Sequence, residues 1–266
     1  MINESRYRRL DLSGDELSYS WIIPDLRESV QRLWDVYAKE VYPHDGIVVG
    51  IRNQFFLKRI SEFITPDSCI VVLPCGLTSY PYCAPIGAQF FECDLPELID
   101  YKKARHTALQ AEGVLPPRNI EYLAVDCTVP SQVQQLLDRA GPDRSRFFLI
   151  EGYSYYVEKN AWWGFVELIK AHMQPGDVIA FDYWGAEHRD EAIYKRFIQF
   201  CAEYASYELS SFNFLSLEGI QAAFGEGFEV LSSNVCDEEL KFSGVSILEN
   251  ADEFMKEYYI VARKAA

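Results

Sequence analysis

The chain has 266 residues, 49% of them hydrophobic and 15% aromatic, which suits one large domain with a substantial core. Its 25 basic and 40 acidic residues give a net charge of −15, which repels a phosphate backbone, so we expect no nucleic-acid partner. No apolar run approaches the roughly 20 residues that span a bilayer, and residues 1–18 lack a signal-peptide core, so we expect a cytoplasmic protein without a membrane partner.

The N-terminal quarter is predicted to be helical. Apolar residues recur at helical spacing in 24–42 and again in 52–64, and the sequence Thr65-Pro66-Asp67 then ends the pattern. We therefore interpret residues 1–66 as a helical N-terminal extension that acts as a lid.

From residue 67 onward, strand patterns alternate with helix patterns. Strands are predicted at 69–73, 89–94, 120–126, 146–152, 177–185, 227–233 and 255–264. Helices are predicted at 96–113, 131–141, 160–173 and 186–204. This alternation predicts βαβ units and an α/β domain over 67–266 with a mostly parallel sheet. The last two strands favour an antiparallel hairpin at one edge, and 207–226 is a candidate lid insertion.

Acidic residues follow successive predicted strands. Asp94, Asp126, Glu151 and Asp182 end the second to fifth strands, and ligands of open parallel sheets bind beyond these carboxyl ends. Asp94 lies 18 residues after Gly76, as expected of an acid that binds a ribose diol; the alternative is that it caps the next helix. Asp126 has the same two interpretations, with an adenine amino group as its ligand.

The loop after the first strand, LPCGLT at 73–78, is less typical of a nucleotide site. It has one glycine, so it does not match the G-x-G-x-x-G pattern of dinucleotide-binding loops. The four histidines are scattered and no CxxC or HExxH occurs, so we also expect no metal site.

The order of several segments resembles the leucine carboxyl methyltransferase-like branch of class I S-adenosylmethionine (SAM)-dependent methyltransferases. The most specific are DLPELIDYKK at 94–103 and IEGYSYYV at 150–157, followed by PGDVIAFDY at 175–183 and YYIVARK at 258–264. The resemblance covers roughly 45–264. It implies a Rossmann-like, seven-stranded sheet with SAM as the cofactor at its carboxyl edge.

The resemblance also implies a set of cofactor-binding residues. By position, Arg52 matches the arginine that meets the methionine carboxylate, Gly76 the glycine under the methionyl part, and Asp94 the ribose acid. The remaining members of the set are Leu73, Leu95, Asp126, Cys127 and Glu151. The chain departs from the family at Pro74, which replaces a glycine, and at Thr78, which replaces an aspartate. Proline has no N–H to offer a ligand, so contacts to the methionine part are expected to change.

The family implies methyl transfer to an oxygen, either a carboxylate or a hydroxyl, of a small-molecule or peptidyl acceptor, and natural-product biosynthesis is one setting for it. A hydroxyl needs a base, and the candidate catalytic residues are Tyr153, Tyr156, Asp182, Tyr183 and His188. The aromatic runs at 153–156, 162–163 and 183–184 either wall the acceptor pocket or pack in the core.

Two other interpretations stay open at this point. The altered loop is also consistent with an enzyme of the same fold that catalyses an elimination or cyclisation without methylating. The other is a non-catalytic pseudo-methyltransferase that binds a partner subunit, and the net charge of −15 would suit a basic partner. The sequence does not fix the oligomeric state, whether homo- or hetero-oligomer.

Overall fold

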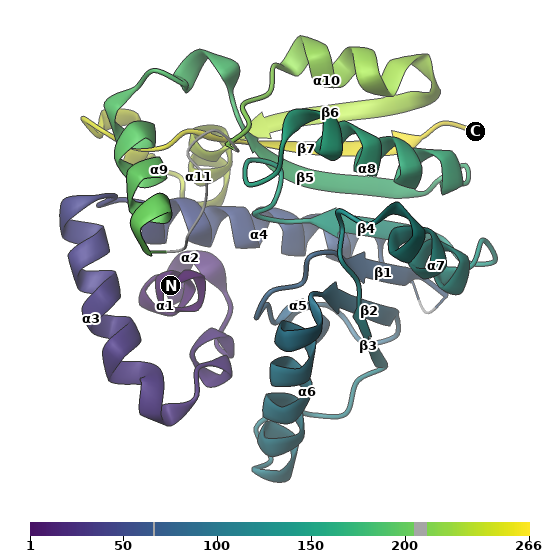
Figure 1. Ribbon diagram of the computed structural model, residues 1–266, viewed down its shortest axis with the longest axis horizontal. Helices are drawn as coiled ribbons and strands as arrows, with labels where there is room; N and C mark the ends of the chain where they lie inside the picture. Colours follow the sequence, from purple (N-terminus) through teal and green to yellow (C-terminus); the bar gives the residue numbers. More distant parts are fainter. Residues whose placement is uncertain (66, 205–211) are drawn as a thin grey trace.

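The computed structural model describes residues 1–65, 67–204 and 212–266 (Figure 1). The strands are β1 (Cys69–Val72), β2 (Gln89–Asp94), β3 (Ile120–Ala124), β4 (Arg146–Ile150), β5 (Val178–Trp184), β6 (Phe228–Asn234) and β7 (Glu257–Lys264). The helices before β1 are α1 (Ile2–Arg8), α2 (Leu10–Ser13), α3 (Pro24–Glu40) and α4 (Asp45–Phe63). Those after it are α5 (Tyr80–Cys83), α6 (Pro96–Ala111), α7 (Pro130–Ala140), α8 (Lys159–His172), α9 (Ala192–Tyr204), α10 (Leu217–Phe224) and α11 (Val235–Ser243).

The strands form a seven-stranded sheet in the order β3-β2-β1-β4-β5-β7-β6. β1 to β5 are parallel to one another, whereas β7 runs antiparallel to both β5 and β6. The strand order reverses between β1 and β4, which places the topological switch point of an open α/β sheet at their carboxyl ends. The predicted α/β class, the mostly parallel sheet and its antiparallel edge are therefore confirmed.

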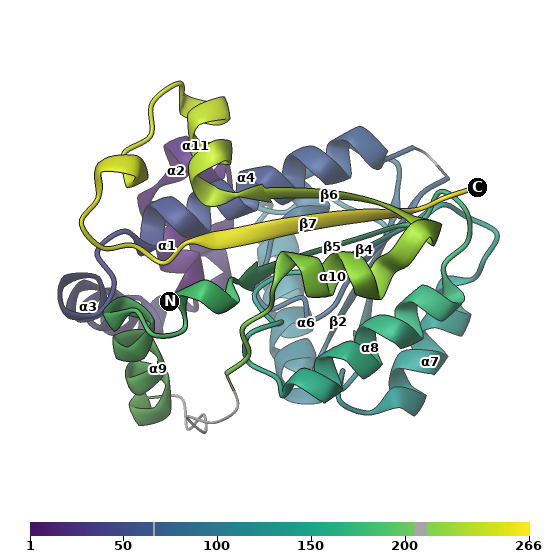
Figure 2. The same ribbon diagram turned by 90° about the horizontal axis from the view of Figure 1, so that it is seen from above.

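Helices cover both faces of the sheet (Figure 2). Strand residues alternate between the two faces, so Val72 and Leu149 pack toward α4, while Val71 and Ile150 pack toward α7 and α8. α7 meets the sheet through apolar side chains spaced by three and four residues, namely Val133, Leu136, Leu137 and Ala140. Both faces of the central strands are thus buried, which explains their nearly continuous apolar sequences.

Three elements differ from the sequence-based expectation. α4 begins at Asp45, well before residue 52, because its first turns are also buried. The link between β6 and β7 contains α11, so these strands are paired neighbours without a tight turn. The first part of the candidate lid, 207–211, lies outside the described residues, while α10 packs on the sheet through Ile220 and Phe224.

The N-terminal helices lie beside the carboxyl edge of the sheet. α1 and α2 pack against α4, and α4 itself belongs to the main hydrophobic core (Figure 1). None of the helices within 1–65, 67–204 and 212–266 is both long and apolar enough to cross a membrane.

Candidate functional site

A cavity of about 560 Å³ lies at the carboxyl ends of β1 to β4. Its border is formed by the loops that follow these four strands, by α1 and by one side chain of α4. The predicted cofactor residues that border it are Arg52, Gly76, Asp94, Leu95, Asp126, Cys127 and Glu151. Leu73 is the exception in this set, because its side chain is buried in the core on the α7–α8 face.

Asp94 connects two parts of the cavity wall. Its Oδ2 accepts a hydrogen bond from the backbone N–H of Gly76 at 2.8 Å, and its Oδ1 accepts one from Leu95 at 2.8 Å. Each carboxylate oxygen has capacity for a further hydrogen bond, as a ribose diol requires. Gly76 has φ +49°, a conformation that favours glycine, although a Cβ there would meet nothing within 4 Å.

Asp126 is less buried than Asp94. One of its oxygens, Oδ1, accepts hydrogen bonds from the backbone N–H and the hydroxyl of Thr128, at 2.8 and 2.6 Å. Its other oxygen has no hydrogen-bond partner within the described parts of the chain. A free carboxylate oxygen beside the cavity can accept a hydrogen bond from an amino group.

Glu151 is clamped by two arginines that come from distant segments. Arg6 of α1 donates through Nη2 to both carboxylate oxygens, at 2.7 and 2.8 Å, and Arg52 donates through Nε at 2.8 Å. Tyr80 adds a hydroxyl at 2.7 Å. Burial disfavours the ionised form, but the charges of Arg6 and Arg52 outweigh it and lower the pKa of Glu151 to about 2.

Arg52 is shared among several acceptors. Its Nη1 donates to Tyr155 at 3.0 Å, Asp182 at 3.3 Å and Glu257 at 2.9 Å. One guanidinium cannot compensate three buried carboxylates, and burial raises the pKa of Asp182 and raises that of Glu257 to about 8. The Nη2 of Arg52 has no hydrogen-bond partner among the described residues and lies near Gly152 on the cavity border.

A second cavity, of about 360 Å³, adjoins the first. The two share Ile2, Arg52, Tyr155 and Tyr156 as border residues. The second cavity is walled mainly by aromatic side chains and also borders two carboxyl groups, Asp45 and Glu257. We call the first the cofactor cavity and the second the aromatic cavity.

The structure separates the five candidate catalytic residues. Tyr153 and Tyr156 border the cofactor cavity, and Tyr156 also borders the aromatic one. Asp182 is fully buried and is not among the residues that border the cofactor cavity or the aromatic cavity; its Oδ1 accepts from the backbone N–H of Gly152 at 2.7 Å. Asp182 therefore contacts Arg52 from within the core, and its hydrogen bond to Gly152 holds the turn after β4.

Tyr183 and His188 also differ from the expectation, since neither is among the residues that border the cofactor cavity or the aromatic cavity. Tyr183 points to the α8 face of β5 and stacks on Tyr258, with ring centroids 5.2 Å apart. His188 bonds to Glu191 at 2.7 Å and to the Tyr258 hydroxyl at 3.0 Å. The predicted aromatic wall divides likewise: the run at 153–156 and Trp184 border the cavities, whereas Trp162 is buried in the core.

Four residues of the site were missed by the sequence analysis: Arg6, Tyr80, Tyr155 and Glu257. Arg6 lies 145 positions from its partner Glu151, and Glu257 lies 205 positions from Arg52. No local pattern signals such contacts. Tyr155 lies inside the aromatic run at 153–156, which was noted as a pocket wall without being resolved into individual roles.

The cofactor cavity fits S-adenosylmethionine in its donor and acceptor groups. It offers carboxylates at Asp94 and Asp126, a free cationic N–H group at Arg52, and the hydroxyl of Thr78. This Thr78 Oγ1 is buried without a partner in the described chain, so it has an unused hydrogen bond beside the loop expected to be altered.

Comparisons with known proteins support the same family. The sequence pattern of the leucine carboxyl methyltransferase family matches residues 30–170, more than half of the chain. YktD of Bacillus subtilis (strain 168), named provisionally as an S-adenosyl-L-methionine-dependent methyltransferase, is 28% identical over 126 residues. That match covers 46% of this chain and 40% of YktD. A similarly named protein of Frankia alni, FRAAL3836, is 30% identical over 37% of this chain and 34% of its own. The matches thus span less than half of these relatives.

Solved structures share the fold at low sequence identity. A DUF574 family protein from Streptomyces avermitilis superposes with a TM-score of 0.62 and 15% identity, over 92% of this chain and 95% of its own. Magnesium protoporphyrin IX methyltransferase from Synechocystis, solved with bound S-adenosylhomocysteine (SAH), superposes with a TM-score of 0.52 and 10% identity. That superposition covers 93% of this chain and all of the other.

Proposed function

Because the chain belongs to the leucine carboxyl methyltransferase family, we propose that it is a SAM-dependent O-methyltransferase acting on a small molecule, of the kind made in natural-product biosynthesis. S-adenosyl-L-methionine is the cofactor, in keeping with the family and with the names of the curated relatives. The observation that carries the proposal is the pair of adjoining cavities with Arg52, Tyr155 and Tyr156 on their common border.

In this proposal, the charged side chains of the cofactor cavity bind the different parts of SAM. Asp94 would accept hydrogen bonds from the ribose hydroxyls, and Asp126 from the adenine amino group. Arg52 would bind the methionine carboxylate through its free Nη2, with Arg6 adding positive charge nearby. Glu151 neutralises part of that charge and keeps both arginines in place, since it bonds to each of them.

SAM, when bound, supplies a methyl group on a positively charged sulfur that is already activated for displacement, so alignment is the main requirement. Tyr155 and Tyr156 stand where an acceptor would meet the cofactor. Burial raises the pKa of Tyr153, so its phenol stays protonated and can donate a hydrogen bond within the cofactor cavity, which it borders. A base for a hydroxyl acceptor would have to be another group.

Methyl transfer can be tested with labelled cofactor. The protein is incubated with SAM carrying an isotopic methyl label and the small-molecule fraction of a cell extract, with heat-denatured protein as the control. We expect label in extractable small molecules only when the protein is folded. Label confined to polypeptides, or SAM that binds but stays intact, would overturn the proposal.

A further inference from the structure

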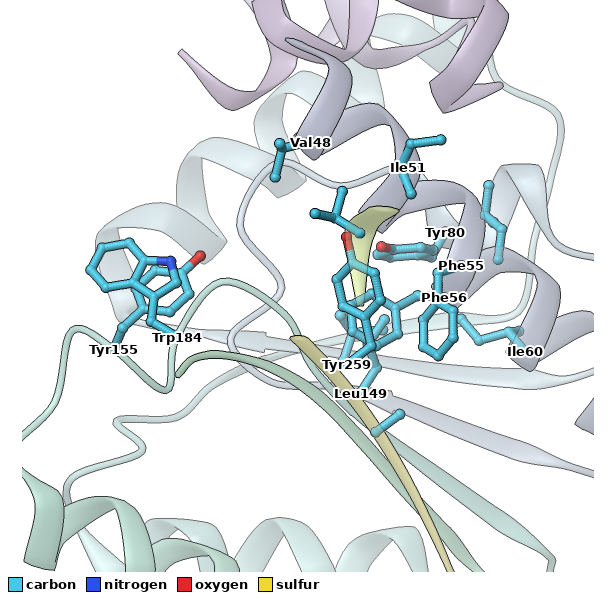
Figure 3. Packing of buried hydrophobic residues seen from close by; sticks show 14 of the residues in the cluster. Val48, Ile51, Phe55, Phe56, Ile60, Tyr80, Leu149, Tyr155, Trp184 and Tyr259 are labelled. Atoms are coloured by element: carbon cyan, nitrogen blue, oxygen red, sulfur yellow. The ribbon is translucent and has the colours of Figure 1, made fainter. Parts of the chain in front are cut away.

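The aromatic cavity has walls suited to a flat ring. Eight of its 17 border residues are aromatic. Tyr155 and Trp184 stack on each other, with centroids 4.2 Å apart and planes 3° from each other, so together they form one flat wall of the cavity without space for a ligand between them (Figure 3). Phe197 meets Trp184 edge-on at 5.4 Å. At about 360 Å³ the cavity is at the small end of ligand sites, so it suits a single compact ring system.

The charges around this cavity disfavour an anion. Two carboxyl groups border it, Asp45 and Glu257, and burial raises the pKa of both. Among the described border residues Arg52 is the one guanidinium; it donates from Nη1 to Glu257 and from Nε to Glu151, and its free Nη2 lies near Gly152 on the border of the cofactor cavity. Met1 also borders the cavity, and burial lowers the pKa of its amino group. A carboxylate here would be buried beside two acidic groups without a counter-charge of its own.

Two polar atoms on the border have no partner in the described chain. Trp184 Nε1 can only donate a hydrogen bond, whereas Glu257 Oε2 donates one when the carboxyl group is protonated and accepts one when it is ionised. Trp184 and Glu257 are direct cross-strand partners in the β5–β7 ladder, so their side chains leave the sheet side by side on one face. A hydroxyl both donates and accepts, so it can pair with Trp184 Nε1 and with Glu257 Oε2 whether or not Glu257 is protonated.

We propose that the aromatic cavity is the acceptor site, and that it takes an uncharged aromatic ring compound whose hydroxyl group meets Trp184 Nε1 and Glu257 Oε2. The assignment as acceptor site rests on the proposed function. The ligand class rests on the cavity itself, and it differs from the carboxylate acceptors for which the family is named.

Calorimetric titration of three matched probes into protein saturated with SAH tests the ligand class. The probes are 2-naphthol, 2-naphthoate and 2-(aminomethyl)naphthalene, which share one ring system and differ in charge. We expect naphthol to bind at least about tenfold more tightly than either of the others. Equal or tighter binding of the naphthoate or the amine, or no binding of naphthol, would overturn the inference.

The same experiment keeps the two proposals apart. If SAH itself fails to bind, the proposed function fails. If SAH binds and naphthol does not, only the acceptor assignment fails. SAH binding also shows that each variant below is folded.

Two variants locate the probe. Trp184→Phe keeps the ring but removes the Nε1 donor, so naphthol should bind about 3–10-fold more weakly while naphthalene is unchanged. Cys201→Trp fills the cavity from α9 and should abolish naphthol binding with SAH affinity kept, whereas Gln199→Trp, exposed on the same helix, should change neither. Naphthol binding that survives Cys201→Trp, or that Gln199→Trp abolishes equally, would contradict the site.

Discussion

The two cavities meet at Arg52, yet the buried carboxyl groups beside them have pKa values that are shifted in opposite directions. On the cofactor side, Glu151 has Arg6, Arg52 and Tyr80 as partners, and its pKa is lowered to about 2. On the aromatic side, burial raises the pKa of Glu257 to about 8, although Arg52 donates to it at 2.9 Å. The second arginine makes the difference, because Arg6 reaches Glu151 and not Glu257.

This contrast indicates what each cavity can hold. The cofactor cavity keeps fixed ionic groups, which suits a ligand with charges of both signs such as SAM. On the aromatic side, burial raises the pKa of Glu257 to about 8, so this group stays protonated at neutral pH, which suits a neutral ligand. The predictions below test this contrast, from the largest expected effect to the smallest.

Glu151→Gln should cause the largest loss of stability. It leaves Arg6 and Arg52 buried without their shared counter-ion, and removing one partner of such a group costs about 3–5 kcal/mol. Urea unfolding at pH 7 measures it, with the exposed Glu167→Gln as a control that should change stability by less than about 0.5 kcal/mol. The stabilisation by Glu151 is complete above about pH 4.5 and is lost as the pH falls toward 2. A loss below about 1 kcal/mol at pH 7 would contradict the clamp.

Glu257→Gln should have the opposite effect at high pH. Folded Glu257 keeps its proton up to about pH 8, whereas the unfolded chain releases it near 4.5. Between these values the folded state binds more protons, so the stability of the wild type falls as the pH rises. The variant lacks this penalty and should be more stable by as much as about 4 kcal/mol at pH 9, with little difference at pH 4. Asp45, Glu151, Asp182 and Arg52 are the charged groups that face Glu257, and Tyr42, Tyr194 and Tyr259 also lie near it. All of these remain unchanged in the variant.

Urea unfolding of both proteins between pH 4 and pH 9 measures this difference. If the free energy of unfolding changes with pH in the same way for both proteins, the pKa of Glu257 is not raised.

Asp94→Asn should weaken SAH binding about 10–100-fold, because hydrogen bonds from the ribose to a charged carboxylate are lost. Asp126→Asn should weaken it less, about 3–10-fold, since that residue is more exposed to water. Calorimetry on both variants gives the comparison. The reverse ranking would shift the ribose to the end of β3.

His188→Ala should have the smallest effect. His188 lies outside both cavities and bonds to Glu191 and Tyr258, so SAH and naphthol affinities should change less than about twofold. A tenfold loss of SAH or naphthol affinity would show that His188 contributes to ligand binding.

The sequence predicted the acids of the cofactor cavity because they depend on local rules. Asp94, Asp126 and Glu151 end parallel strands, and parallel strands present their carboxyl ends at one edge. The residues after β5 were harder, because side chains alternate along a strand. Trp184 therefore reaches the aromatic cavity, while Tyr183 faces α8.

The contacts that distinguish the two cavities could not be predicted from sequence. Arg6 reaches Glu151 only because α1 packs against α4, and Glu257 reaches Arg52 only because β7 is inserted between β5 and β6. Both depend on the tertiary arrangement. The shifted pKa values follow from these contacts and from burial, so they also could not be predicted from the sequence.

A crystal structure of the protein with SAH tests the central claim most directly. We predict one SAH in the cofactor cavity, with its ribose hydroxyls on Asp94, its carboxylate on Arg52 Nη2, and the aromatic cavity free of it. SAH that lies in the aromatic cavity, or with its ribose away from Asp94, would contradict the account.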